Sequence, residues 1–218
     1  MSSGNNNCED NRQTTVRSTM TNSSIFLMVD VQVDFCPGGS LAVPGGDEII
    51  PTINRYLEIF GAQELPLYAS RDWHPPVTDH FRQFGGLWPP HCVRDSAGAR
   101  FHPALKLTRQ VTIVSKGMDP KKDDYSALQG QTEAGLTLET IMAEQGVKRL
   151  YVCGLATDYC VKETCLEALR GGFLVTLLTD AIRGVDVMPG DSERAIGEIA
   201  AAGGELADLA VIVKRPEL

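Results

Sequence analysis

Short apolar runs alternate with amphipathic segments along most of the chain. The first run, Ile25-Phe26-Leu27-Met28-Val29, is continuous, which is typical of a strand covered on both faces of a parallel sheet. Similar runs predict further strands at residues 65–70, 111–115, 150–153, 173–178 and 209–213. Apolar positions at helical spacing predict helices at residues 48–60, 136–145, 191–202 and in the segment after Asp158, with Gly61 and Gly146 as stops.

This alternation of strands and helices predicts an α/β fold. Strands separated by helices favour parallel pairing with right-handed crossovers. We therefore expect a three-layer α/β/α domain over residues 24–218, with a doubly wound, mostly parallel six-stranded sheet. A chain of 218 residues suits one such domain.

Residues 1–23 differ from the rest of the chain. They are rich in Asn, Ser and Thr and almost free of apolar residues, which predicts a disordered polar tail. Arg12 and Arg17 favour a transit peptide, but Glu9 and Asp10 and the weak amphipathicity count against one. The segment lacks the apolar core of a secretory signal, so we expect a cytoplasmic protein.

The charge and apolar content of the chain argue against some classes of binding partner. A net charge of -8 and a pI near 5.0 disfavour nucleic acid and anionic membranes, and no apolar run approaches the roughly 20 residues of a membrane span. We expect a small-molecule substrate, and a homo-oligomer stays open. The cysteines lack a Cys-x-x-Cys pair, which argues against a zinc ribbon or a disulfide framework. They are Cys8, Cys36, Cys92, Cys153, Cys160 and Cys165.

One strand-to-helix turn carries a candidate nucleophile. Gly154 is expected to end the strand at residues 150–153, and Asp158 is a candidate N-cap for the next helix. Cys160 would then lie in the first helical turn, where unpaired backbone N–H groups favour a thiolate and can hold an oxyanion. The alternative is that Cys160 is a buried packing residue, as most such cysteines are.

Two charged residues follow other predicted strands. Asp30 comes directly after the first strand and Lys116 after the third, so both should reach the same edge of a parallel sheet as Cys160. The alternatives are a loop-capping Asp and a solvated Lys. Asp34 is a rival acid, for which a turn or capping role is the stronger interpretation.

Histidines concentrate in and beside the long segment 75–103. Asp72 and His74 are two residues apart after a predicted strand, so their side chains project to the same side. An Asp with clustered imidazoles indicates one divalent metal, with zinc fitting best and Fe or Mn compatible. A surface histidine cluster is the alternative. The histidines are His74, His80, His91 and His102.

Five motifs occur in a fixed order. They are Val29-Asp30-Val31-Gln32 with Asp34-Phe35 and Pro37-Gly38-Gly39-Ser40-Leu41; Arg71-Asp72-Trp73-His74; Trp88-Pro89-Pro90-His91-Cys92; Lys116-Gly117; and Gly154-Leu155-Ala156-Thr157-Asp158-Tyr159-Cys160-Val161. Together they resemble the cysteine hydrolases of the isochorismatase-like superfamily, and within it the nicotinamidases. The resemblance covers residues 25–213.

The resemblance implies a role for each motif. Asp30, Lys116 and Cys160 match a catalytic triad, and backbone N–H groups of Ala156 and Cys160 would form the oxyanion site after a cis peptide at Leu155-Ala156.

The resemblance also implies a metal and substrate site. The matching metal ligands are Asp72, His74 and His91, and His80 matches a position that is an extra ligand in some relatives; His102 matches no motif. The residues expected to hold the substrate ring are Phe35, Trp88 and Tyr125, the last within a flap at residues 119–132.

The implied activity is hydrolysis of nicotinamide to nicotinic acid and ammonia through a cysteine thioester, in NAD salvage. The metal would bind the pyridine nitrogen and position the amide. Two alternatives stay open at this point: a cysteine hydrolase of another small amide or carbamoyl compound, and a non-catalytic metal-binding member of the fold.

Overall fold

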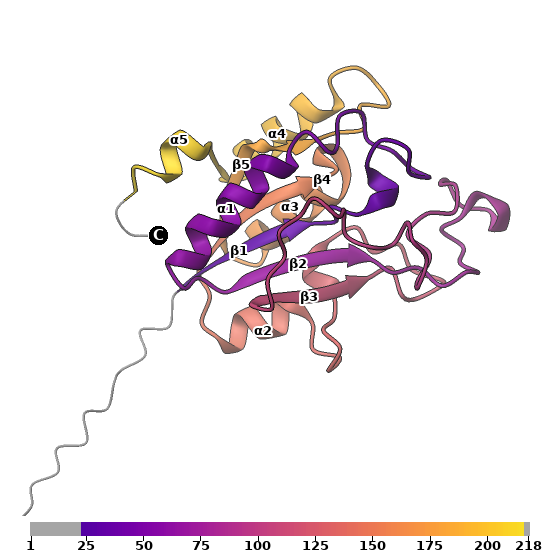
Figure 1. The fold of residues 1–218 in the computed structure, drawn as a ribbon, viewed down its shortest axis with the longest axis horizontal. Helices are drawn as coiled ribbons and strands as arrows, with labels where there is room; N and C mark the ends of the chain where they lie inside the picture. The colour runs from indigo at the N-terminus through magenta and orange to yellow at the C-terminus, as the bar shows by residue number, and fades with distance from the viewer. Residues whose placement is uncertain (1–22, 216–218) are drawn as a thin grey trace, which may run out of the picture.

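The computed structural model describes residues 23–215, and the tail predicted at residues 1–23 lies outside this range except for Ser23. Its centre is a six-stranded sheet with the order β3-β2-β1-β4-β5-β6, in which each pair of neighbouring strands is parallel (Figure 1). The strands are β1 (Ser24–Val29), β2 (Leu67–Asp72), β3 (Val111–Lys116), β4 (Arg149–Leu155), β5 (Leu174–Arg183) and β6 (Glu205–Ala207). The predicted α/β class and strand number are confirmed.

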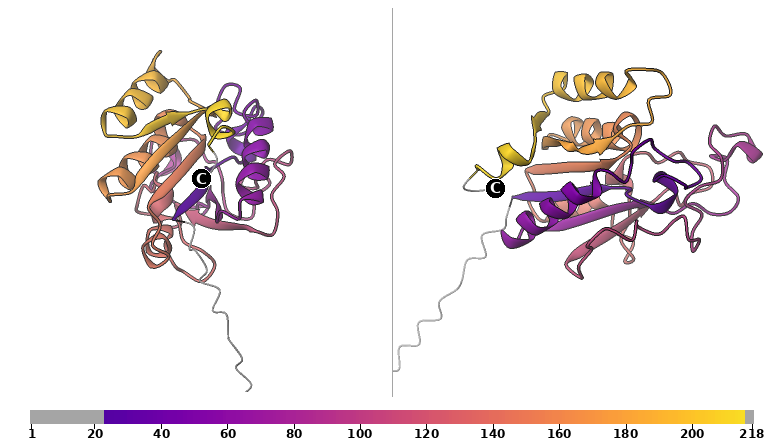
Figure 2. Two further views of the ribbon diagram at one scale, coloured as in Figure 1. Left: turned by 90° about the vertical axis from the view of Figure 1, so that its left-hand side faces the viewer. Right: turned by 45° about the horizontal axis from the view of Figure 1, so that its top comes forward.

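Helices cover both faces of the sheet, and Figure 2 shows α1 and α3 on opposite sides of it. The α-helices are α1 (Ile50–Ala62), α2 (Leu138–Glu144), α3 (Lys162–Arg170), α4 (Asp191–Ala201) and α5 (Leu209–Ile212). Side chains of β1 alternate between the two faces. Phe26 and Met28 join an apolar cluster with α1 and α5, whereas Leu27 and Val29 join a second cluster with α2, α3 and α4. The expected three layers follow from this alternation.

Aromatic side chains of α1 pack against strands β1 and β4. Phe60 of α1 lies 5.0 Å from Phe26 of β1 and 4.9 Å from Tyr151 of β4, measured between ring centroids. Aromatic pairs at this separation contribute about 0.5–1.5 kcal/mol beyond the burial of their area. Strands β1 and β4 are therefore held rigidly against α1, and so are the residues that directly follow them.

The prediction of a strand at residues 209–213 is wrong. Residues Leu209–Ile212 form helix α5, and the sixth strand is the short β6 just before it. The Asp208 side chain accepts a hydrogen bond from Val211 N at 2.9 Å and so caps α5. A short apolar run has no periodicity that distinguishes a strand from a helical turn, and here the cap decides.

Two glycines lie inside elements that they were expected to end. Helix α1 passes Gly61 and ends at Ala62, and β4 passes Gly154 and ends at Leu155. Gly154 has φ of 117°, and a Cβ there would lie 2.1 Å from the carbonyl oxygen of Val29. The glycine therefore serves the close approach of β4 to β1 rather than the end of the strand.

The strand order reverses between β1 and β4. From β1 the chain proceeds outward to β2 and β3, then returns to the other side of β1 for β4, β5 and β6. In open α/β sheets the crevice beyond the carboxyl ends of such strands is where ligands bind. The long loops gather at this end (Figure 1).

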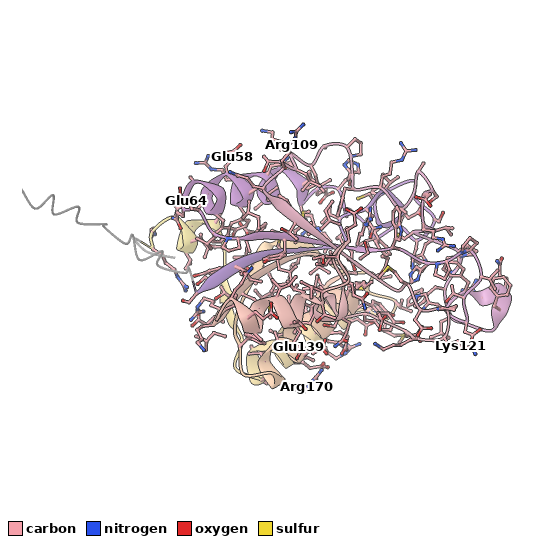
Figure 3. All side chains as sticks on the ribbon, turned by 90° about the horizontal axis from the view of Figure 1, so that it is seen from below. Glu58, Glu64, Arg109, Lys121, Glu139 and Arg170 are labelled. Atoms are coloured by element: carbon pink, nitrogen blue, oxygen red, sulfur yellow. The ribbon has the colours of Figure 1, made fainter. Side chains whose placement is uncertain are left out.

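The outer surface is charged. In Figure 3, Glu58 of α1 and Arg170 of α3 lie on opposite outer layers, and Lys121 lies at the loop end. Within residues 23–215 no helix has both the length and the apolarity to cross a membrane.

Candidate active site

Asp30, Lys116 and Cys160 meet beyond the carboxyl ends of β1, β3 and β4. The Lys116 Nζ lies 2.9 Å from Asp30 Oδ2 and 3.4 Å from Cys160 Sγ, and all three residues are buried. Ser70 Oγ donates to Asp30 Oδ1 at 2.6 Å, whereas Asp30 Oδ2 has no regular hydrogen-bond partner among the described residues. Oδ1 is therefore held by Ser70 and Oδ2 by the ion pair with Lys116, and an oxygen of Asp30 lies within 4.8 Å of Cys160 Sγ.

Burial is the largest influence on the pKa values of Asp30 and Cys160. It raises the pKa of Asp30 despite the opposing charge of Lys116, and it also raises the pKa of the Cys160 thiol. Burial alone would lower the pKa of Lys116, but the carboxylates of Asp30 and Asp72 outweigh it and raise that pKa. The raised pKa of Cys160 fits a thiol whose proton passes to Asp30 during the reaction, rather than a thiolate favoured by the helix terminus alone.

Cys160 lies in a π-helical turn rather than in the first turn of an α-helix. Residues Thr157–Val161 form this turn, and α3 begins directly after it. The carbonyl of Ala156 accepts from both Tyr159 N and Val161 N at 3.1 Å. Single π turns occur frequently at functional sites because they shift a side chain out of helical register. The peptide between Leu155 and Ala156 is cis, as the family resemblance implied.

Asp158 is not the N-cap that the sequence predicted. Its carboxylate accepts from Val185 N at 2.9 Å and from Asp186 N at 2.8 Å. Ala156 is the N-terminal flanking residue of the π turn, and no side chain caps it. The sequence gives no sign of these partners, because they come from the loop after β5.

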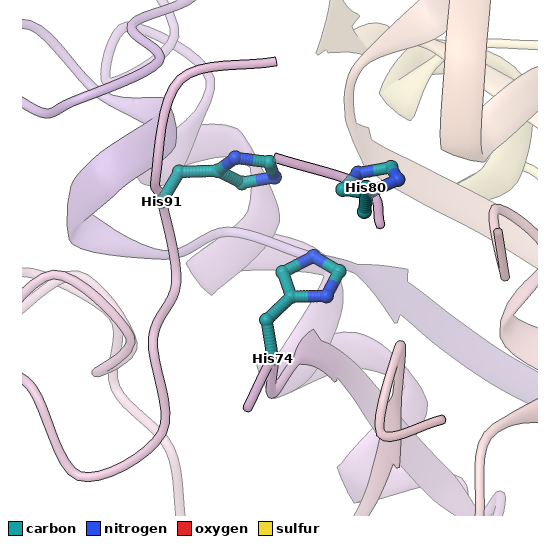
Figure 4. A group of neighbouring side chains, drawn as sticks. All are labelled: His74, His80 and His91. Carbon is teal, nitrogen blue, oxygen red and sulfur yellow. The ribbon is translucent and has the colours of Figure 1, made fainter. Parts of the chain in front are cut away.

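A second group, of one carboxylate and three imidazoles, faces the same pocket. Asp72 Oδ2 lies 3.6 Å from His74 Nε2 and 3.9 Å from His91 Nε2. His74, His80 and His91 each offer a ring nitrogen within 4.8 Å of the other two, and Figure 4 shows their rings turned toward a common space. His102 is not part of this group; it lines a separate surface groove beside α1.

Backbone carbonyls orient two of these rings. His74 Nδ1 lies 3.0 Å from the carbonyl oxygen of Gly117, and His91 Nδ1 lies 2.8 Å from that of Pro89. A carbonyl only accepts, so each Nδ1 carries the proton and each Nε2 keeps its lone pair, the arrangement usual for metal-binding histidines. The buried His74 Nε2 has no hydrogen-bond partner among residues 23–215.

The charge state of the group also suits a divalent cation. Burial lowers the pKa of His91 to about 4, so its imidazole is neutral near pH 7. Burial alone would raise the pKa of Asp72, but Lys116 and His74 outweigh it and keep Asp72 ionised. An ionised carboxylate beside imidazole nitrogens is a donor set for a metal such as zinc. His80 is oriented differently, since its Nδ1 pairs with the Asp123 carboxylate of the flap.

Lys116 joins the two groups. Its Nζ donates to Asp72 Oδ1 at 2.5 Å while it contacts Asp30 and Cys160. Gln32 fixes Asp72 from the other side, donating to the Asp72 carbonyl at 2.8 Å and accepting from the Asp72 N–H at 2.7 Å. Gln32 belongs to the first sequence motif, but the motif alone does not indicate this role.

Cys160 lines one cavity together with Asp72 and the three histidines, and its volume is about 470 Å³ including the open mouth. Phe35, Trp88 and Tyr125, the residues predicted to hold the substrate ring, all line it. Trp88 Nε1 donates to the Tyr125 hydroxyl at 3.0 Å, which joins the long loop to the flap.

Five further side chains line the cavity that the sequence did not predict there, which are Leu41, Val43, Asp124, Tyr159 and Val185. Leu41 and Tyr159 belong to motifs, so their position was a usable signal. Val185 follows β5 in a segment without a motif, and nothing in the sequence marks it.

Asp34, the rival acid, has a structural role. Its carboxylate accepts from Ser40 N at 3.1 Å and from Cys92 N at 2.7 Å. These bonds join the loop after β1 to the loop that carries His91. The interpretation of Asp34 as a turn residue is confirmed.

The isochorismatase domain family matches residues 24–211, which is most of the chain. The chain belongs to this family. The recognition from the five motifs is confirmed.

Relatives within the isochorismatase family have related activities. A nicotinamidase from Escherichia coli is 40% identical over 201 residues, covering 85% of this chain and 94% of that protein. The crystal structure of a Pyrococcus horikoshii pyrazinamidase in complex with zinc is similar with a TM-score of 0.79 and 43% identity, covering 86% of this chain and 99% of that one. A protein from L. infantum in complex with nicotinate has a TM-score of 0.74 and 34% identity, covering 87% and 94%.

Proposed function

We propose that this chain is a nicotinamidase, which hydrolyses nicotinamide to nicotinic acid and ammonia. The observation that carries the proposal is the meeting of Asp30, Lys116 and Cys160 beside a cavity that Cys160 lines together with Asp72 and the three histidines. The identity to the Escherichia coli nicotinamidase supports the same activity. On this proposal the protein acts in NAD salvage and is cytoplasmic.

Acylation begins with a proton transfer inside the triad. Asp30 takes the proton of Cys160, and Sγ attacks the carbonyl carbon of the amide. The C–N bond then breaks, and Asp30 returns the proton to the leaving nitrogen, which departs as ammonia. The raised pKa of Asp30 suits this exchange, because a carboxyl with an ordinary pKa near 4 holds a proton poorly near pH 7.

Deacylation reuses the same carboxylate. Asp30 removes a proton from a water molecule that attacks the thioester carbon. The C–S bond breaks, the proton passes from Asp30 to Sγ, and nicotinic acid leaves. Lys116 keeps its positive charge beside both anionic stages, since its pKa lies well above its usual value.

The oxyanion of each tetrahedral intermediate needs fixed donors. We assign this role to the backbone N–H groups of Ala156, which directly precedes the π turn, and of Cys160, which lies within it. These groups belong to rigid backbone next to β4, so little reorganisation is needed during the reaction.

Asp72, His74 and His91 would hold one divalent metal, with His80 as a further ligand. Zinc suits these nitrogen and oxygen donors, and Fe and Mn are compatible. When bound, the metal supplies a Lewis-acid contact for the ring nitrogen of the substrate. Phe35, Trp88 and Tyr125, which line the same cavity, would pack against the ring.

A substrate panel tests the proposal. We expect ammonia release from nicotinamide to exceed that from benzamide, which lacks the ring nitrogen, and from small carbamoyl compounds. Higher kcat/KM for a carbamoyl compound would transfer the assignment to another amidase of this family. Metal binding without ammonia release from any amide would indicate a non-catalytic member.

A further inference from the structure

The loop between β5 and α4 contributes Val185 to the wall of the active-site cavity. Val185 lines the same space as Cys160 and Tyr159 and packs against the apolar cluster on the α1 face of the sheet. Its neighbours Val187 and Met188 are exposed by 61% and 63%. Val185 is therefore directed inward from a loop that is otherwise largely on the surface.

Asp158 fixes the backbone of this loop. Its Oδ1 accepts from Val185 N at 2.9 Å and its Oδ2 from Asp186 N at 2.8 Å, so each carboxylate oxygen holds one loop residue. Asp158 is buried and lies two residues before Cys160 in the π turn. The wall position of Val185 is thus tied to the turn that carries the nucleophile.

The two sides of the loop leave it little freedom. Asp186 accepts from Ser192 N and from Ser192 Oγ, both at 2.8 Å, at the start of α4. A Cβ on Gly184 would lie 1.8 Å from Ser192 Oγ and 3.0 Å from Asp158 Oδ1. A side chain at position 184 would displace the Ser192 hydroxyl that bonds Asp186, so the loop packs closely against the start of α4 on one side of Val185 and is bonded to it on the other.

We propose that Val185 is a specificity-determining residue, which limits the substituents that a pyridine carboxamide can carry on its ring, and that Asp158 is the positioning residue that holds Val185 in the wall. This inference rests on the proposed function, because hydrolysis requires the amide carbon to reach Cys160 Sγ and so fixes the pose of the ring. A wall that cannot recede then excludes extra methyl groups. One methylene in an apolar pocket changes kcat/KM by roughly 10- to 200-fold.

The first test uses nicotinamide and nicotinamides that carry one methyl group at each free ring carbon. Val185→Ala enlarges the cavity, and we expect the kcat/KM of at least one methylated substrate relative to nicotinamide to rise about tenfold. Val185→Ile reduces the cavity, and the same ratio should fall. Val187→Ala is the matched control from the same loop, and its ratios should stay within about twofold of wild type, as is usual for surface sites.

The second test asks whether Asp158 acts through Val185. Asp158→Asn places an amide N–H₂ against a backbone donor and should loosen the loop, so the ratio for the same methylated substrate should rise. In a Val185→Ala background, Asp158→Asn should add no further change, because the group that it positions is already gone. Asp180→Asn is the control: Asp180 also accepts a backbone hydrogen bond, from Leu209 N at 3.0 Å, but outside the cavity. It should leave the ratio unchanged.

Two readouts separate the possible failures. Circular dichroism establishes that each variant is folded, and the rate of iodoacetamide alkylation of Cys160 shows whether Asp158→Asn disturbs the nucleophile itself. Equal ratios in wild type, Val185→Ala and Val185→Ile would overturn the inference, as would additive effects of Asp158→Asn and Val185→Ala. A folded wild-type protein with no activity on nicotinamide would instead overturn the proposed function, and this inference with it.

Discussion

The two halves of the cavity are built in different ways. Asp30, Lys116 and Cys160 are themselves buried and lie at or beyond the carboxyl ends of three strands, and the sheet sets their spacing. In the other half, which consists of Asp72 and the three histidines, only Asp72 belongs to a strand. His80 and His91 come from the irregular segment between β2 and β3.

This difference shows where each half gains its rigidity. The triad is positioned by main-chain pairing of β1 and β4 and by the aromatic stack on α1. The histidines depend on single contacts from Nδ1, with the carbonyls of Gly117 and Pro89 and with the Asp123 carboxylate. We therefore expect the triad to persist without metal, and the histidine half to be the part that a bound ion completes.

The largest effect should follow removal of the nucleophile. Cys160→Ala should lower kcat on nicotinamide at least about 1,000-fold, because no thioester can form. Metal content, measured by atomic emission, should be unchanged, since Cys160 is outside the histidine group. Cys165→Ala is the matched control, a buried cysteine of α3 that should lose stability but keep kcat. Near wild-type ammonia release by Cys160→Ala would refute the role of the thiol.

The second largest effect should follow removal of the proton acceptor, Asp30. Asp30→Asn should slow thioester formation about 100- to 1,000-fold in a rapid-quench experiment, as expected for loss of a general base. The control is Asp34→Asn, which affects a carboxylate that only holds Ser40 N and Cys92 N and should mainly lower the thermal midpoint. If Asp34→Asn instead stopped acylation, the assignment of the acid would be wrong.

The same contrast explains what the sequence could predict. The strand ends could be predicted because continuous apolar runs precede Asp30 and Cys160. In a parallel sheet the carboxyl ends of the strands lie at one edge, which brings these residues together. The group of Asp72 and the histidines could be predicted from its residue types and motifs. The partners of Asp158 and the wall position of Val185 were not, because they depend on contacts across 27 and 28 residues of chain that no local pattern records. The strand predicted at residues 209–213 was wrong for a related reason. Asp208 caps helix α5 there, and the apolar run is too short to show helical periodicity.

Metal removal separates positioning from chemistry. Dialysis against a chelator, or His74→Ala with His91→Ala, should lower nicotinamide hydrolysis about 100-fold, the order of loss expected when a reacting group is misplaced by about 1 Å. The alkylation rate of Cys160 should survive, because Asp30 and Lys116 contact the thiol directly. Benzamide should be a poor substrate in either state. Loss of thiol reactivity on chelation would show that the two halves are not separable in this way.

The smallest effect should come from the contact that orients His80. A carboxylate on Nδ1 leaves Nε2 free as a ligand, so Asp123→Asn should weaken metal binding about tenfold, within the range for groups that hold a metal ligand in place. Calorimetric titration with Zn²⁺ measures this directly. Asp119→Asn is a control from the same flap, because within residues 23–215 the Asp119 side chain accepts a hydrogen bond only from Lys121 N, at 2.9 Å.

His80→Ala completes the comparison. If His80 is a ligand, His80→Ala should weaken Zn²⁺ binding more than Asp123→Asn does, and Asp123→Asn should have no further effect in its absence. If His80→Ala binds Zn²⁺ as tightly as wild type, the ligands are Asp72, His74 and His91 alone. The His80–Asp123 pair would then be a tie between the long loop and the flap, and its loss should appear as faster proteolysis of the flap rather than as weaker metal binding.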